Sequence, residues 1–371
     1  MPGEADGTRP GRSEEEVLDA IEARRRRPRR KLLDQQITLS HGAGGKSSHD
    51  LIEALFLRAL RNPRLEPLTD SALLSPGDGA GPRLAFTTDS FVVRPLFFPG
   101  GDIGELAVNG TVNDLAMAGA RPLALSAGFI VEEGLPVADL EKIAVSMGAA
   151  AKAAEVEVAT GDTKVVERGK ADGLYINTSG VGVLGPDVEL SPGRIQAGDR
   201  VIVSGSIGDH GMAIMIARGD LELEVELESD TAPLHGLVTT LLEAVPDGVR
   251  CLRDPTRGGL ATVLTELALA AELGIVIDEA SLPVRAEVTG ACEILGLDPL
   301  YVANEGKLAA VVAPDAEAAA LDVLRSHPLG ADAVTVAEVT PEPPGLVLLE
   351  TSFGGSRVVD MLAGDPLPRI C

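Results

Sequence analysis

The stretch Phe98-Pro-Gly-Gly-Asp-Ile-Gly-Glu-Leu-Ala-Val-Asn-Gly-Thr-Val-Asn-Asp-Leu-Ala-Met-Ala-Gly-Ala120 decides the fold of this chain. It predicts a helix that begins near Ile103 and ends at Gly119, because apolar residues recur along it and a glycine follows the last of them. Such a helix can turn Leu106 and Leu115 toward a core. A buried strand over 123–130 follows it, which is the alternation typical of an α/β protein.

Polar residues interrupt the same helix in a regular way. Asn109 and Asn113 are four residues apart and therefore share one face. Asn, Asp and Gly are weak helix formers, and together they cost about 2 kcal/mol of helix propensity. This sacrifice indicates a ligand at that face, and oxygen ligands of this kind suit Mg²⁺. A buried polar network is the alternative.

Two strands of a predicted hairpin precede the helix, and each carries an aspartate. Asp70 lies in 69–74, and Asp89 follows Thr88 in 84–93. Because Asp is a poor strand residue, it indicates a strand edge, a turn, or a carboxylate directed at a metal ion.

A glycine-rich loop lies near the start of the ordered chain. We expect a short strand over 36–40, the loop His41-Gly-Ala-Gly-Gly-Lys-Ser-Ser48, and then an amphipathic helix with Leu51, Leu55 and Phe56 on its core face. A turn between strand and helix can present N–H groups to a phosphate. It is no Walker A loop, since Ser40 stands where that motif needs glycine. A phosphate clamp and a tight turn both remain open.

The α/β alternation continues through a predicted helix over 137–156 and a strand that turns at Gly161-Asp-Thr-Lys164. Proline and glycine cluster at 185–198 and predict a domain boundary. The second half restarts with the strand and glycine-rich turn of 199–211. The fold class is thus α/β (α+β), with two domains that each hold a mixed sheet and packed helices. The predicted parts are a basic extension (1–35), an N-terminal domain (36–188), a C-terminal domain (189–358) and a flexible tail (359–371).

A second anion-binding site is predicted in the C-terminal domain. Arg253 and Arg257 flank Asp254 directly before two glycines and a long apolar helix. Further along, Asn304-Glu-Gly-Lys307 introduces a strand.

The chain ends in Asp-Pro-Leu-Pro-Arg-Ile-Cys371. Pro366 and Pro368 favour an extended backbone, so the tail reads as a short semi-rigid arm that carries a thiol. The alternative is a frayed end with an accidental cysteine.

Composition excludes several classes of protein. The formal net charge of −24 argues against general nucleic-acid binding, although a basic run lies over 24–31. Three cysteines are too few for a disulfide framework, and Cys251 and Cys292 are expected to be small buried hydrophobes. No apolar run is long enough for a membrane span, and no signal peptide is evident, so we expect a cytoplasmic protein.

Taken together, these motifs resemble the HypE family of hydrogenase-maturation proteins, within the superfamily of aminoimidazole ribonucleotide synthetase, selenophosphate synthetase and thiamine-monophosphate kinase. The terminal Pro-Arg-Ile-Cys371 separates HypE from its relatives. The resemblance runs from about residue 36 to the C-terminus and leaves out 1–35. In chain order the motifs are His41–Lys46, Thr88–Ser90, Asn113–Ala120, Gly161–Lys164, Ser204–Gly211, Arg253–Gly259 and Asn304–Lys307.

The resemblance implies an ATP-dependent carbamoyl dehydratase. A HypF-like carbamoyltransferase would place a carboxamide on Cys371, and the enzyme would convert it to a thiocyanate. The cyano group would pass to iron on a HypC–HypD complex. The family also implies a homodimer whose N-terminal strands pair across the two-fold axis.

The resemblance also implies roles for residues. Cys371 would carry the substrate, Glu305 would be the base and Lys164 would orient or neutralise charge. Mg²⁺ would be held by Asp70, Asp89, Asp114 and Asp254. ATP would be bound by Gly42, Gly44, Gly45, Lys46, Thr88, Asn113, Gly161, Asp162 and Thr163.

Two other functions stay open from the sequence. One is a small-molecule kinase or synthetase of the same superfamily, in which Cys371 would be idle. The other is a non-enzymatic carrier that binds ATP as a switch.

Overall fold

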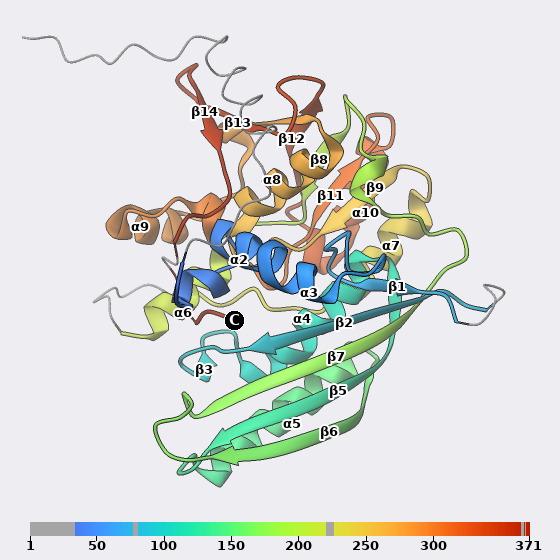
Figure 1. Cartoon of the computed structure of the whole chain (residues 1–371). Helices are drawn as coiled ribbons and strands as arrows, with labels where there is room; N and C mark the ends of the chain where they lie inside the picture. The colour runs from blue at the N-terminus through green and yellow to red at the C-terminus, as the bar shows by residue number, and fades with distance from the viewer. Residues whose placement is uncertain (1–33, 77–80, 220–225, 365–366, 368) are drawn as a thin grey trace, which may run out of the picture.

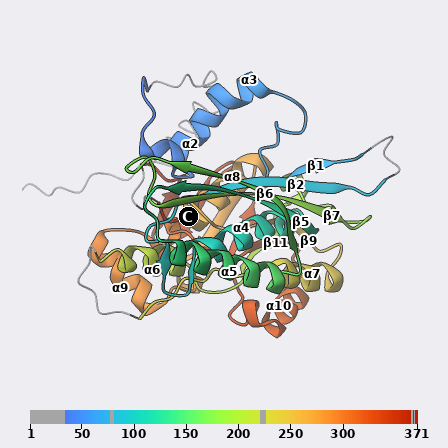
Figure 2. The same ribbon diagram turned by 90° about the horizontal axis from the view of Figure 1, so that it is seen from below.

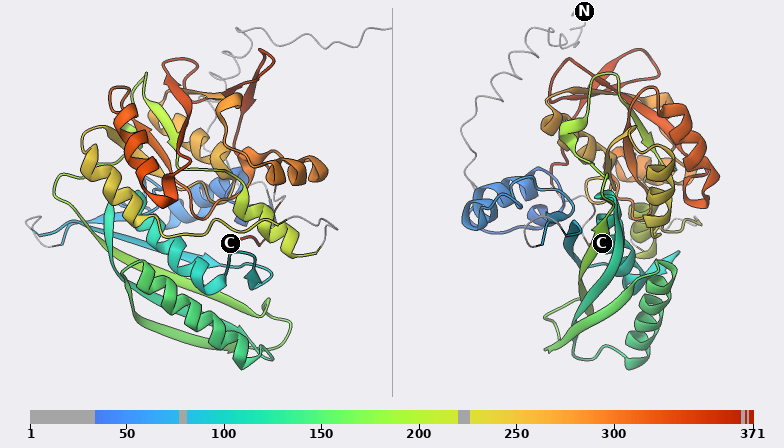
Figure 3. Two further views of the ribbon diagram at one scale, coloured as in Figure 1. Left: turned by 180° about the vertical axis from the view of Figure 1, so that it is seen from behind. Right: turned by 90° about the vertical axis from the view of Figure 1, so that its right-hand side faces the viewer.

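The computed structural model describes residues 34–76, 81–219, 226–364, 367 and 369–371. The basic run over 24–31 and most of the predicted extension lie outside the described residues. The described chain forms two sheet-based halves, and the C-terminus lies between them (Figures 1 and 3).

The N-terminal half is a five-stranded sheet with the order β1-β2-β7-β5-β6. Neighbouring strands are antiparallel except β5 and β6, which are parallel. The helices α4 and α5 cover one face (Figure 2). The bounds are β1 Ala72–Leu74, β2 Leu84–Phe91, α4 Ile103–Met117, β5 Ala120–Glu132, α5 Val137–Ala153, β6 Glu157–Val166 and β7 Leu174–Leu184, with the short pair β3 Phe97–Phe98 and β4 Gly101–Asp102.

The C-terminal half is a seven-stranded sheet with the order β14-β13-β10-β12-β8-β11-β9. Its strands are β8 Arg200–Val203, β9 Val249–Arg253, β10 Gly274–Asp278, β11 Ala309–Val312, β12 Val334–Thr340, β13 Val347–Glu350 and β14 Ser356–Val359. Its helices are α6 Asp209–Ala217, α7 His235–Ala244, α8 Gly259–Ala271, α9 Ala286–Leu295 and α10 Glu317–Ser326. The mixed α/β class and the two halves are as predicted.

Helix α4 confirms the prediction from which the sequence analysis started. Asp102 caps it, because its carboxylate accepts the N–H groups of Gly104 at 2.7 Å and Glu105 at 3.2 Å. Gly119 ends it with φ +73°, a conformation that glycine adopts without strain. Nearly every residue of α4 is buried, so the helix is a core element.

The predicted ligand face of α4 is a buried polar network. The Asn113 amide donates to the carbonyls of Ala232 and Glu305, and its oxygen accepts the N–H of Leu234 at 2.8 Å. Asn109 donates to the Thr231 hydroxyl at 3.2 Å. These bonds tie α4 to loops of the C-terminal half and pair both polar atoms of the Asn113 amide, whereas Oδ1 of Asn109 is buried without a hydrogen-bond partner among the described residues.

Two local predictions near the N-terminus are wrong. Residues 36–40 form no strand; a 3₁₀ turn, Leu39–Gly42, stands there. The predicted amphipathic helix exists as α2 Lys46–Leu51, a π-helical turn Ile52–Leu57 and α3 Arg58–Leu60. Its apolar face is not in the core, because Leu55 and Phe56 are about half exposed and the helix lies across the sheet from α4 and α5 (Figure 2).

The turn predicted at Gly161-Asp-Thr-Lys164 is also wrong. These residues continue strand β6, which pairs with β5 from Glu157 to Val166. In the described part of the chain, no helix is long and apolar enough to cross a membrane.

Candidate active site

Four aspartates approach one another from separate elements. Asp70 precedes β1, Asp89 lies on β2, Asp114 lies on α4 and Asp254 follows β9. These are the four residues that the family resemblance implies as Mg²⁺ ligands. Three of them, Asp70, Asp114 and Asp254, line one cavity of about 600 Å³ between the two halves.

The carboxylates of this aspartate cluster raise one another's pKa. Burial, and then the charge of Asp70, raises the pKa of Asp254 to about 7. Burial raises the pKa of Asp114 well above its ordinary value, and the nearby aspartates add to that shift. A cluster that resists ionisation in this way is suited to a cation or to a ligand that brings cations.

Two arginines offset part of this charge. Nε of Arg253 lies 3.1 Å from Oδ2 of Asp70, and Nη2 of Arg257 lies 3.7 Å from Oδ1 of Asp89. Among the described residues, no group of three Asp, Glu, His or Cys side chains is arranged to hold a metal ion unaided.

The glycine-rich loop packs tightly against the C-terminal half. A Cβ on Gly44 would lie 2.6 Å from the Cβ of Arg257, and one on Gly45 would lie 2.2 Å from the carbonyl oxygen of Leu362. The N–H of Lys46 donates to the same carbonyl at 2.9 Å. Close packing thus accounts for two of the glycines. Gly44, with Thr88, also lines the 600 Å³ cavity.

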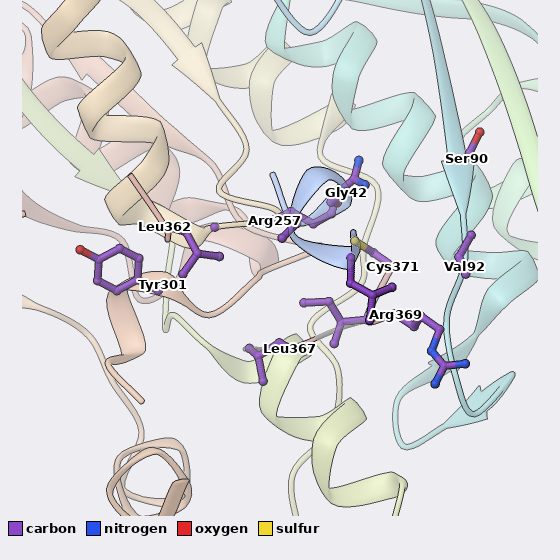
Figure 4. A pocket seen from close by; sticks show the side chains of 13 residues that line it. Gly42, Ser90, Val92, Arg257, Tyr301, Leu362, Leu367, Arg369 and Cys371 are labelled. Carbon is purple, nitrogen blue, oxygen red and sulfur yellow. Dashed lines mark hydrogen bonds between the residues drawn. The ribbon is translucent and has the colours of Figure 1, made fainter. Parts of the chain in front are cut away.

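A smaller cavity of about 210 Å³ adjoins this loop, and Cys371 lines it (Figure 4). Gly42 and Arg257 line it as well, and Arg257 also lines the 600 Å³ cavity. The guanidinium donates to the carbonyl of Gly42 at 3.3 Å. Arg257 is therefore the side chain common to the two cavities.

The thiol of Cys371 forms a hydrogen bond with the carboxyl group of Glu305. Burial raises the pKa of Glu305 well above its ordinary value, and the charge of Asp254 adds to this effect. Burial also raises the pKa of Cys371, and its hydrogen bond to Glu305 adds to that shift. A terminal thiol, a buried carboxyl and Arg257 are thus gathered in one place, as a group-transfer site requires.

The segment Gly161–Thr163 and Lys164 lie elsewhere in the single chain. Asp162 and Lys164 are exposed on β6 and form an ion pair with each other. β7 and β5 separate β6 from β2, so the strand carrying Asp89 is about 14 Å away at the usual strand spacing. One copy of the chain does not bring these four residues to the aspartate cluster, and their assigned roles stay predictions.

Two residues at the site were absent from the predicted set. Arg257 was noted in an anion-binding mouth, but its position between two cavities depends on loop packing that no motif reveals. His210 belongs to a quoted motif, yet it was given no role; it hydrogen-bonds to the carbonyl of Ile370. Both contacts join segments more than 150 residues apart, and a single sequence gives no signal for such pairs.

Comparison with known proteins gives consistent matches. The family models for AIR synthase related proteins match over residues 69–184 (N-terminal domain) and 196–348 (C-terminal domain). Carbamoyl dehydratase HypE of Bradyrhizobium diazoefficiens is 54% identical over 335 residues, which are 90% of this chain and 96% of the relative.

Solved structures agree with this likeness. A HypE–HypF complex contains a chain with 49% identity and a TM-score of 0.79, covering 84% of this chain and 99% of that one. The structure of HypE in complex with ATP has 47% identity and a TM-score of 0.75, and the match covers 91% of this chain and 100% of that one.

Proposed function

The chain belongs to the HypE family of carbamoyl dehydratases, and we propose that it uses ATP to dehydrate a carboxamide carried on its own Cys371. One observation carries this proposal. The Cys371 thiol hydrogen-bonds to Glu305, and the cavity that Cys371 lines shares Arg257 with the larger, aspartate-lined cavity. We propose that the larger, aspartate-lined cavity holds the nucleotide, because its carboxylates can bind the Mg²⁺ that accompanies ATP; a relative of this family has been solved in complex with ATP.

The proposed chemistry starts from a thiocarboxamide, S–C(=O)–NH₂. Its oxygen is a very poor leaving group, so the oxygen first attacks the γ-phosphorus of ATP and ADP departs. The carbon–oxygen bond then breaks, phosphate leaves, and the two nitrogen protons are lost as the C≡N bond forms. The products are a thiocyanate on Cys371, ADP and phosphate. The cyano group then becomes a ligand of the hydrogenase iron.

Glu305 is the proposed base for a nitrogen proton. Its carboxyl is buried and its pKa is raised, which makes the ionised form a stronger base than an exposed glutamate. Arg257 is the proposed counter-charge. Because it lines both cavities, its guanidinium can stabilise negative charge on the phosphoryl group as that group is transferred from ATP to the carboxamide oxygen of the tail.

The residues present fit a Mg²⁺ ion. Asp254 is buried and the other three aspartates are partly buried, the charges of neighbouring aspartates raise the pKa values of Asp114 and Asp254, and Mg²⁺ in such sites uses one or two carboxylates together with phosphate oxygens. We propose that Asp70, Asp89, Asp114 and Asp254 supply these carboxylates. When bound, the ion would neutralise phosphate charge. The glycine-rich loop with Lys46, Thr88 and Asn113 remain the proposed contacts to ATP.

A homodimer is the proposed setting for the residues on β6. Ile130 and Phe86 are exposed on sheet strands although they are apolar, and β6 is an exposed edge. A second copy that covers this sheet can bring its own Lys164 and Gly161–Thr163 to the site. These residues would then act between subunits rather than within one chain.

The tail must work in two places. In the docked position the pKa of the Cys371 thiol is raised, so little of the nucleophilic thiolate is present there. We therefore propose that a HypF-like carbamoyltransferase meets the tail away from this cavity, as does a HypC–HypD complex that receives the cyano group. A relative of this family has been solved in complex with HypF. We further propose that these exchanges occur in the cytoplasm, whose reducing conditions suit the free thiols of all three cysteines.

The mass of the C-terminal peptide tests this proposal. With a HypF-type partner and its substrates, Cys371 should gain one carbamoyl group, and the peptide should lose one water only after ATP and Mg²⁺ are added. A Cys371→Ser variant provides the control. A carbamoylated peptide whose mass does not change with ATP would overturn the proposal, and turnover of a free small molecule by Cys371→Ala would favour a kinase.

A further inference from the structure

His210 is fully buried at the start of α6, and both of its ring nitrogens have partners. Nδ1 lies 2.8 Å from the Ser229 hydroxyl, and Nε2 lies 2.7 Å from the carbonyl oxygen of Ile370. A carbonyl only accepts, so Nε2 carries the proton and Nδ1 accepts from Ser229. The edge-on ring of Phe98, at 5.8 Å between centroids, holds the imidazole plane.

Arg218, at the other end of the same helix, holds the neighbouring tail residue. Its Nη2 donates to the carbonyl of Arg369 at 2.6 Å, and its Nε donates to the carbonyl of Arg94 at 2.8 Å. The N–H of Arg94 also donates to the Arg369 carbonyl, at 3.1 Å. Two consecutive tail carbonyls are therefore bound by donors associated with α6.

Side chains of the tail complete the fit. Leu367 and Ile370 are buried in the same apolar cluster as Met212 of α6. The Arg369 guanidinium donates to Asp172 at 2.7 Å, and its backbone has φ +57°, which a non-glycine residue adopts only when contacts hold it there. Main-chain and side-chain contacts of Leu367, Arg369 and Ile370 thus seat the tail, in addition to the contact of the Cys371 thiol with Glu305.

We propose that His210 and Arg218 form a docking slot for the C-terminal tail and are positioning residues for its dehydration. Neither side chain is assigned to the reacting atoms or to the nucleotide. Because Ile370 is adjacent to Cys371, a bond to its carbonyl limits where the thiol can lie relative to Glu305. The slot binds the main-chain carbonyls of Arg369 and Ile370, which do not change when the thiol is carbamoylated. It can therefore bind the free and the carbamoylated tail alike. The catalytic part of this inference rests on the proposed function.

The slot predicts opposite effects on two reactions. Loss of the His210 donor leaves a buried carbonyl unpaired in the docked state only, so the tail should spend more time undocked. We expect the ratio of undocked to docked tail to rise about tenfold or more, which is the factor that ~1.4 kcal/mol produces. Reactions of the undocked thiol, such as alkylation, should be faster, and dehydration, which needs the docked tail, should be slower.

The experiment compares His210→Leu with His210→Gln in the full chain. Leu removes the donor, whereas the Gln amide can donate to the same carbonyl. His327→Leu makes the same chemical change at the cap of a distant 3₁₀ turn. The first readout is the rate at which iodoacetamide alkylates Cys371 without ATP, followed by the mass of the C-terminal peptide.

We expect His210→Leu to be alkylated about tenfold faster than wild type and His210→Gln to lie closer to wild type. In single turnover of a carbamoylated tail, Leu should slow dehydration about tenfold or more while the dissociation constant for ATP stays unchanged. Equal alkylation rates in wild type and His210→Leu would overturn the slot. A parallel loss of ATP affinity would show a general structural defect and would overturn the positioning role.

A second variant guards against misfolding. Arg218→Met removes a donor from the surface end of α6, and the same alkylation and dehydration changes are expected if His210→Leu does not fold. Alkylation requires no dehydratase activity, so the two proposals fail separately. A protected wild-type thiol without ATP-dependent water loss refutes the proposed function alone; an unprotected thiol with normal water loss refutes the slot alone.

Discussion

Asp254→Asn removes one carboxyl group from the aspartate cluster, and we predict that it stabilises the metal-free protein. Burial and the charge of Asp70 raise the pKa of Asp254 from 3.8 to about 7. Since the folded-state pKa lies above the unfolded value, the folded protein holds this proton longer. Stability therefore falls as the pH rises from about 4 to about 7.

The size of the effect follows from that window. Each pKa unit corresponds to 1.36 kcal/mol, so the whole shift is worth at most ~4 kcal/mol, and the part between about pH 5 and pH 7 at most ~2.7 kcal/mol. Asn recovers less than this, because the attraction of Arg253 is lost and a buried amide still needs partners. We expect Asp254→Asn to stabilise by about 1–2 kcal/mol more at pH 8 than at pH 5.

Urea unfolding with EDTA at both pH values measures this difference. Asp322→Asn is the matched control, since Asp322 is exposed on α10 and its replacement should change stability little at either pH. The same variant of Asp254 should weaken ATP-dependent turnover, because it removes a proposed Mg²⁺ ligand. A stability change in Asp254→Asn that is equal at pH 5 and pH 8 would refute the electrostatic reasoning.

Three further predictions concern the reaction and the assembly. Glu305→Gln should slow dehydration about 10²–10⁴-fold with ATP affinity intact, and the wild-type rate should fall as the pH drops through the raised pKa of Glu305; equal rates in peptide mass assays would remove Glu305 from the role. Arg257→Met should shift that pH profile to higher pH, because Arg257 lowers the pKa of Glu305, and an unshifted profile would contradict this. Ile130→Asp, on the open sheet face, should make the protein monomeric in sedimentation, whereas Val145→Asp on α5 should leave it dimeric; a dimer in both would exclude this face.

The elements that sequence predicted well are those whose signals are local. Helix α4 is followed by a glycine after its last apolar residue, and the sequence between the paired strands β1 and β2 is rich in glycine. Asp89 and Asp114 were noticed because Asp is unfavourable in a strand or a helix, whereas the full set of four aspartates came from the family resemblance. Propensity and capping act over a few residues, so one sequence suffices to detect them.

The misses share a different cause. The helical apolar run with Leu55 and Phe56 has the pattern of a core helix, but in one chain α4 and α5 already cover the other face of the sheet. Gly161–Lys164 has turn composition, yet the parallel register with β5 holds it as a strand. Arg257 and His210 owe their positions to contacts with distant segments. In each case, tertiary context outweighs local preference.

The fate of the carboxamide oxygen tests the central claim most directly. A carbamoyl group labelled with ¹⁸O is loaded on Cys371, ATP and Mg²⁺ are added, and the inorganic phosphate is analysed by mass. If the oxygen attacks the γ-phosphorus, the label must appear in phosphate, one atom for each thiocyanate formed. Thiocyanate formed with unlabelled phosphate, and the label in water, would contradict phosphorylation of the amide and with it the proposed use of ATP.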